Sequence, residues 1–114
     1  MTSAVSEREQ RVGMNEALFR EVNERIDGMN RTFATATGTM SIVCECGDRD
    51  CISQIEIPLP EYEQLRADPT TFAIVPGHEV PGVEDVIGRR EGYEVVRKHP
   101  GVSQLIAKAT DPRA

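Results

Sequence analysis

All three cysteines of this 114-residue chain lie within eight residues, in the run Cys44-Glu45-Cys46-Gly47-Asp48-Arg49-Asp50-Cys51. Zinc in a structural site takes four cysteine or histidine ligands arranged as a tetrahedron. A strand places residues i and i+2 on the same side, so Cys44 and Cys46 are expected to face one ion. Gly47 is expected to adopt a positive φ that bends the chain and returns Cys51 to that ion. The spacing therefore predicts a zinc knuckle.

The fourth ligand has to come from another part of the chain. His78 is the best candidate, because it lies in a loop with two Pro-Gly pairs that present a side chain from a stiff backbone. His99, next to a proline, is the second candidate, and Asp48, Asp50 or Glu79 remain if neither histidine reaches the thiolates. The predicted cofactor is Zn, with no catalytic residue assigned, and the predicted metal ligands are Cys44, Cys46, Cys51 and His78.

Two other interpretations of the cysteines stay open. They are either three reduced thiols in a tight turn without a metal, or a redox switch in which Arg49 favours a nearby thiolate. A disulfide between Cys44 and Cys46 would close a strained ring, which disfavours the switch. The odd number of cysteines also argues against a disulfide framework.

The elements that must position these ligands begin with a helix predicted from Ser6 to about Gly28. Ser6 and Glu9 match a capping box, whose side chains satisfy amides of the first turn. Apolar residues recur at spacings of three and four, the period of an amphipathic helix. This stripe consists of Leu18, Val22, Ile26 and Met29. The opposite, charged face is expected to face solvent and holds Arg20, Glu21, Glu24, Arg25 and Asp27.

Gly28 and Asn30 are the predicted stop signals of this helix, and the small, polar residues 32–39 are predicted to be a linker. A long helix is not stable alone in water, so its apolar stripe must meet either the rest of the domain or another chain. Packing on its own domain is the simpler of these two alternatives.

The remaining residues alternate in the way strands do, with short helical segments between them. Residues 40–46 and 54–59 are expected to form a hairpin whose turn is the knuckle. Further along, we predict a helix at 60–68, a strand at 71–75, a second hairpin at 83–98 and a helix at 102–109. The expected fold class is α+β, with a long N-terminal amphipathic helix and a small, mostly antiparallel sheet. The expected division is residues 1–37, helix and linker, and residues 38–114, a zinc-stapled α+β domain.

Charge and hydropathy narrow the class of partner. Residues 38–88 carry ten acidic and two basic side chains, which disfavours direct contact with a nucleic-acid backbone. No apolar run reaches the roughly 20 residues of a membrane span, and the first residues are charged where a signal peptide would be apolar. We therefore expect a cytoplasmic protein without membrane or direct nucleic-acid contact.

The order Cys-x-Cys-Gly-x-x-x-Cys of residues 44–51 resembles the post-SET zinc knuckle of histone lysine methyltransferases. That resemblance covers eight residues and implies zinc bound by three cysteines and a distant fourth ligand, but no activity. Over its whole length the chain resembles a family of small actinobacterial proteins whose activity is uncharacterised, which implies a bacterial cytoplasmic protein. The resembling segments are residues 11–26, 44–46, 61–69, 76–79 and 93–96.

Two functions are expected to compete. The first is a non-enzymatic protein-interaction or regulatory module with a structural zinc, which offers the helix face Leu18, Val22, Ile26 and Met29 to a protein partner or to a second copy. The second is a small enzyme with a catalytic three-thiolate zinc site and Glu79 as general base. Binding to a protein of the transcription machinery is a further alternative, and the sequence does not distinguish it from the first function.

Overall fold

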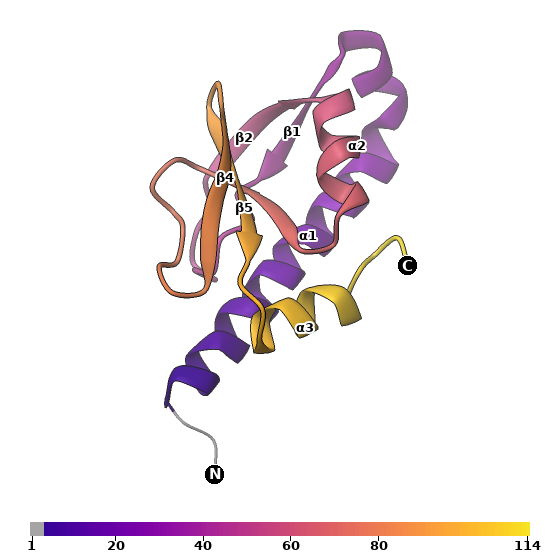
Figure 1. Ribbon diagram of the computed structural model, residues 1–114. Coiled ribbons are helices and arrows are strands. Elements are labelled where there is room, and N and C mark those ends of the chain that lie inside the picture. The colour runs from indigo at the N-terminus through magenta and orange to yellow at the C-terminus, as the bar shows by residue number, and fades with distance from the viewer. Residues whose placement is uncertain (1–3) are drawn as a thin grey trace.

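The computed structural model describes residues 4–114 and has the expected α+β class, with three helices and two small antiparallel sheets in that range (Figure 1). The elements follow the order α1 (Ala4–Thr37), β1 (Thr39–Val43), β2 (Gln54–Pro58), α2 (Leu59–Ala67), β3 (Thr71–Ile74), β4 (Glu84–Arg90), β5 (Tyr93–Lys98) and α3 (Val102–Ala109). β1 pairs with β2, and β5 lies between β3 and β4. Both predicted hairpins and both short helices are therefore present.

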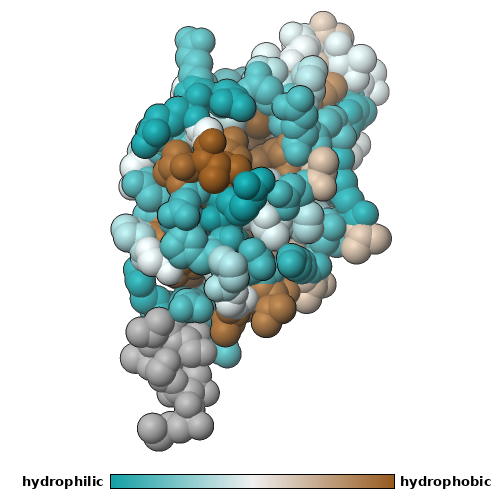
Figure 2. Space-filling view, viewed as in Figure 1, coloured by the Kyte–Doolittle hydropathy of each residue, from teal (hydrophilic) through white to brown (hydrophobic). Residues whose placement is uncertain are grey.

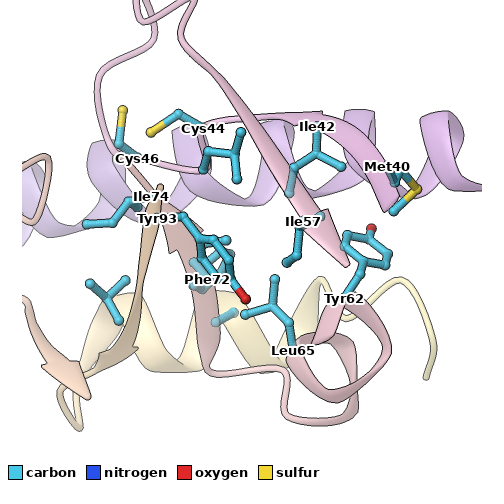
Figure 3. Close-up of a cluster of buried hydrophobic side chains, with 14 of the residues drawn as sticks. Met40, Ile42, Cys44, Cys46, Ile57, Tyr62, Leu65, Phe72, Ile74 and Tyr93 are labelled. Atoms are coloured by element: carbon cyan, nitrogen blue, oxygen red, sulfur yellow. The ribbon is translucent and has the colours of Figure 1, made fainter. Parts of the chain in front are cut away.

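The β1–β2 hairpin carries the cysteine run between its two strands. Met40 lies opposite Ile57 and Ile42 opposite Ile55, and all four side chains are buried. This alternation is the one expected of strands with one face toward a core. The core of the molecule lies between the two sheets, α1 and α2 (Figure 3).

α1 is longer than predicted. It passes through Gly28 and ends at Thr37, where Gly38 adopts a φ of 81° and donates its N–H to the carbonyl of Ala34 at 2.7 Å. The prediction of an end near Gly28 and of a linker at 32–39 is therefore wrong. The second half of α1 is held by tertiary contacts, because Ala34 is buried and Arg31 pairs with Glu63 at 2.6 Å.

The start of α1 and its length also differ from expectation. Ser6 lies inside the helix, which already includes Ala4, so Ser6 is not its N-cap. A helix of 34 residues spans about 51 Å. This length matches the longest dimension of the molecule, 51 Å. Across the described residues, no helix combines the length and the apolar character that crossing a membrane requires.

The face of α1 that packs on the domain is polar. Glu16, Arg20, Asn23 and Asp27 are buried, whereas Leu18 and Met29 are exposed and Val22 and Ile26 are partly buried. The expectation that Arg20 and Asp27 face solvent is thus wrong. The four buried polar residues lie on one side of the helix, and the apolar stripe predicted from sequence lies on the other side.

The buried polar side chains of Arg20 and Asn23 on α1 find partners across the fold. Arg20 donates to the carbonyls of Pro69 and Ala107 at 2.6 and 2.8 Å. Oδ1 of Asn23 accepts the N–H of Val43 at 2.8 Å, and Nδ2 of Asn23 donates to the carbonyl of Val43 at 2.9 Å. The Asn23 amide therefore continues the hydrogen-bond ladder at the free edge of β1. Buried groups with such partners avoid the cost of lost hydration.

A second buried ionic group connects α1 to the three-stranded sheet. The Lys98 ammonium on β5 contacts the carboxylates of Glu16 on α1 and Glu84 on β4. Burial lowers the pKa of Lys98 to about 7 and raises the pKa of Glu84 to about 7. Burying two carboxylates and one ammonium costs free energy of hydration. Their mutual contacts offset this cost only if α1, β4 and β5 keep fixed relative positions.

Candidate metal centre

Four side chains that the sequence singled out meet at one point. The candidate ligand atoms of Cys44, Cys46, Cys51 and His78 all lie within 4.8 Å of one another. Cys44 follows β1, Cys51 lies shortly before β2, and His78 lies in the loop between β3 and β4. Figure 3 shows the sulfur atoms of Cys44 and Cys46 at the end of the core opposite Met40 and Tyr62. The fold thus brings together a group of side chains that is able to hold a metal ion.

Two separations between the donor atoms fit a tetrahedral ion. The Nδ1 atom of His78 lies 3.6 Å from Cys44 Sγ and 3.7 Å from Cys51 Sγ. Bonds of about 2.3 Å to sulfur and about 2.0 Å to nitrogen at a tetrahedral angle place sulfur and nitrogen about 3.5 Å apart. The donor set, three sulfurs and one imidazole, is also one that zinc accepts. Nδ1 is therefore the histidine nitrogen that faces the site.

The loop that carries His78 is held against the knuckle by backbone bonds. Gly77 has a φ of 89°, and the His78 N–H bonds to the carbonyl of Val75 at 3.0 Å, so the predicted tight turn is present. The N–H of Val75 donates to Cys44 Sγ at 3.2 Å. A hydrogen bond from a backbone N–H favours the thiolate that a metal requires.

Cys44 and Cys46 influence each other's ionisation. The contact with Cys44 lowers the pKa of Cys46 to about 5, whereas the same contact and burial raise the pKa of Cys44. The physical cause is a hydrogen bond in which the Cys44 thiol donates to the Cys46 thiolate. The Cys46 side chain is thus the sulfur of this pair that carries negative charge most readily.

Gly47 serves the site in a different way from the one predicted. It has no positive φ, so the expected left-handed bend is wrong. A Cβ atom at this position would lie 2.7 Å from Cγ1 of Val12 on α1. The carbonyl of Gly47 also accepts a bond from Nδ2 of Asn15 at 2.8 Å. Glycine is needed because the knuckle packs directly on the helix.

Replacing Gly47 by alanine is expected to lower the free energy of unfolding by about 1 to 3 kcal/mol, the usual cost of overpacking. Val12 is β-branched and buried, so it has little freedom to move away from the added methyl group. Urea denaturation measures the change. Gly28→Ala is the matched control, because no atom lies within 4 Å of its Cβ position and the helix gains about 0.5 to 1 kcal/mol. Equal effects of the two substitutions would contradict the packing account.

Glu45 is a residue of the site whose role the sequence pattern did not predict. The alternation of the strand assigned it to the side opposite the cysteines, and the structure buries it completely there. Its carboxylate accepts bonds from both terminal nitrogens of Arg66 at 2.6 and 2.8 Å, from Nδ2 of Asn23 at 2.7 Å and from the N–H of Ala73 at 3.0 Å. Glu45 therefore fixes the middle of the knuckle to α1, α2 and β3.

The bond between Glu45 and Arg66 also affects Arg66. Burial by itself would lower the pKa of Arg66, yet the charge of Glu45 raises this pKa above its ordinary value. The guanidinium and the carboxylate form a two-pronged, fully buried pair. No short motif in the sequence links residues 45 and 66, so only the fold identifies this pair.

The other proposed donors lie away from the four-residue group. Nε2 of His99 pairs with Asp85 at 2.9 Å, and this contact raises the pKa of His99. Asp48 and Asp50 are exposed at the tip of the knuckle. Glu79 is adjacent to His78, but its Oε2 atom is buried without a hydrogen-bond partner among the described residues. None of these four belongs to the group around the thiols.

Comparison with protein-family models, curated proteins and solved structures finds no significant match to this chain.

Proposed function

We propose that the protein is a non-enzymatic zinc-binding module, in which zinc held by Cys44, Cys46, Cys51 and Nδ1 of His78 staples the knuckle to the β3–β4 loop. The observation that carries this proposal is the pair of S···N separations, 3.6 and 3.7 Å, which match the edges of a zinc tetrahedron. Four ligands from one chain are typical of a structural site. The stapled domain presents α1 to a protein partner.

A structural role is further supported by how the donors are held. The knuckle is fixed by the buried Glu45 carboxylate, and the histidine loop is fixed by the bond from Val75 to Cys44. Such outer contacts orient ligands and keep the site closed. Three thiolates also donate much electron density to the ion, which weakens its action as a Lewis acid on a substrate.

A second candidate function is an enzyme in which a water replaces His78 and Glu79 acts as general base. One observation favours it, the buried Oε2 atom of Glu79, which has no hydrogen-bond partner in the described part of the chain. A general base must lie within hydrogen-bond distance of the water it activates. The second candidate therefore requires His78 to leave the ion, which the turn at Gly77 opposes.

Metal analysis of the purified protein tests the proposal. We expect one zinc per chain, and an X-ray absorption spectrum with three sulfur neighbours and one nitrogen neighbour. Cys51→Ser and His78→Ala are each expected to weaken zinc binding at least about tenfold, because each removes one ligand. His99→Ala is the matched control and is expected to keep full zinc content, since Asp85 holds that ring elsewhere.

Two results would overturn the proposal. One is a wild-type protein that binds no zinc, and the other is a His78→Ala variant with unchanged affinity. A wild-type spectrum that lacks the outer-shell scattering of an imidazole ring would instead support the open, catalytic site.

A further inference from the structure

The outward face of α1 carries apolar side chains that the rest of the domain leaves exposed. Met14, Leu18, Met29 and Phe33 are 56, 57, 78 and 70% exposed, respectively. At 3.6 residues per turn these four side chains fall within an arc of about 100°, along about 28 Å of helix. They lie opposite the buried polar face that packs on the sheets. We call these four residues the α1 stripe.

The stripe continues onto α3 at one end of the molecule. Leu105 is also exposed, and it lines a hollow of about 270 Å³ together with Met14 and Ile106. Figure 2 shows apolar side chains gathered over α3. Exposed apolar side chains gathered along one side of a small domain are typical of an interaction surface.

Two charged residues lie halfway along the α1 stripe, Arg25 within its arc and Glu21 just beside it. The side chains of Glu21 and Arg25 are 50 and 77% exposed, and they pair with each other at 3.8 Å. They have opposite signs and stand one helical turn apart. A partner that covers the stripe and pairs with both residues therefore places a positive charge at Glu21 and a negative charge at Arg25.

A second copy of the same helix meets this requirement when it runs antiparallel. A two-fold axis near residue 23 brings Leu18 opposite Met29 of the second copy, and Glu21 opposite Arg25 of the second copy. In a parallel pair the two-fold axis runs along the helices, which sets residues of the same number at the same level and leaves Glu21 one helical turn from Arg25 of the second copy. The mixed charges also differ from the basic flanks of a helix that binds a membrane surface.

We infer that a second copy of this chain docks on the α1 stripe, with the two α1 helices antiparallel and Glu21 of each paired with Arg25 of the other. This inference names the partner of the proposed zinc module, and it rests on that proposal only because zinc is expected to keep the domain folded. The interface is isologous, as in most two-fold dimers. The exposed leucine, methionine and phenylalanine side chains supply its apolar area.

Sedimentation equilibrium of the zinc-loaded full chain tests the inference. We expect a dimer in the micromolar range, about 1 to 100 µM. Leu18→Glu and Met29→Glu are each expected to raise the dissociation constant at least about tenfold, because each buries an unpaired carboxylate. Glu91→Arg, in an exposed turn away from α1, is the control and is expected to leave the constant unchanged.

A mixing experiment tests the antiparallel arrangement itself. Glu21→Arg and Arg25→Glu each place like charges across the interface, so each variant alone is expected to dissociate about tenfold more readily. In an equimolar mixture, both contacts across the two-fold axis become attractive, and heterodimers are expected with an affinity within about threefold of the wild type. The repulsion within each helix is unchanged by mixing, so a purely local effect would give no rescue.

The outcomes separate this inference from the zinc proposal. A wild-type chain that is monomeric throughout the concentration range, or a mixture that shows no rescue, would overturn the antiparallel dimer. Zinc content and circular dichroism are measured on the same samples. A zinc-loaded, folded monomer would leave the zinc site standing and assign the stripe to a different partner.

Discussion

Removal of zinc is expected to unfold most of the protein, with a loss of about 10 kcal/mol of stability as for other small zinc domains. A domain of this size is stable by only about 5 to 15 kcal/mol in total. The proposed site joins residues 44–51 to His78, and these two segments otherwise meet through few bonds, chiefly those that Cys44 and Glu45 make to β3 and to Val75. Without the ion, the three thiols lie close together with no metal to hold the two segments in place.

The measurement is thermal unfolding followed by circular dichroism, with and without a strong chelator. We expect the melting temperature to fall by tens of degrees and to return when zinc is added back, since zinc binds the folded state more tightly than the unfolded chain. Magnesium in place of zinc is the control and should not restore folding, because thiolates are poor ligands for it. An apoprotein with an unchanged melting temperature would show that the cysteine cluster is not a structural metal site.

The Arg66→Met variant is expected to lose about 3 to 5 kcal/mol, the cost of leaving one partner of a buried ion pair alone. Arg66 and Glu45 are both fully buried, with their atoms 2.6 Å apart. Methionine fills a similar volume but leaves the carboxylate of Glu45 with only Asn23 and the Ala73 N–H as donors. Urea denaturation of the zinc-loaded protein measures the loss.

A double-mutant cycle assigns that loss to the pair. Arg66→Met combined with Glu45→Leu is expected to be more stable than Arg66→Met alone, because no unpaired buried charge remains. Arg97→Met is the matched control, since Arg97 pairs with Asp68 at 3.1 Å near the surface and its loss should cost no more than about 1 kcal/mol. Similar losses for Arg66→Met and Arg97→Met would contradict the argument.

Local patterns predicted most of the elements and the candidate ligands. Alternation of apolar residues at 40–46 and 54–59 predicted the hairpin, and the Pro-Gly pairs predicted the turn that presents His78. These signals depend on neighbours within a few residues. The end of α1 was not predictable in this way, because the helix continues past Gly28 through contacts of Arg31 with Glu63, which lies 32 residues away.

The orientation of α1 was decided by the same kind of distant contact. An apolar stripe normally faces the core, yet here the domain receives Glu16, Arg20 and Asn23 and leaves Leu18 and Met29 exposed. Partners for the buried groups come from Pro69, Ala107, Lys98 and Val43, which no window of the sequence joins to α1. Hydropathy alone ranks side chains by type and does not count the hydrogen bonds available to them.

The sequence by itself determined the donor types, the spacing of the three cysteines and the strands and turns that hold them, because these depend on short-range geometry. Only the tertiary structure decided that His78 rather than His99 joins the thiols, that Gly47 is required by the approach of Val12, and which face of α1 is left open. The physical reason is that close packing and buried ion pairs depend on residues far apart in the chain, whose meeting the fold as a whole sets.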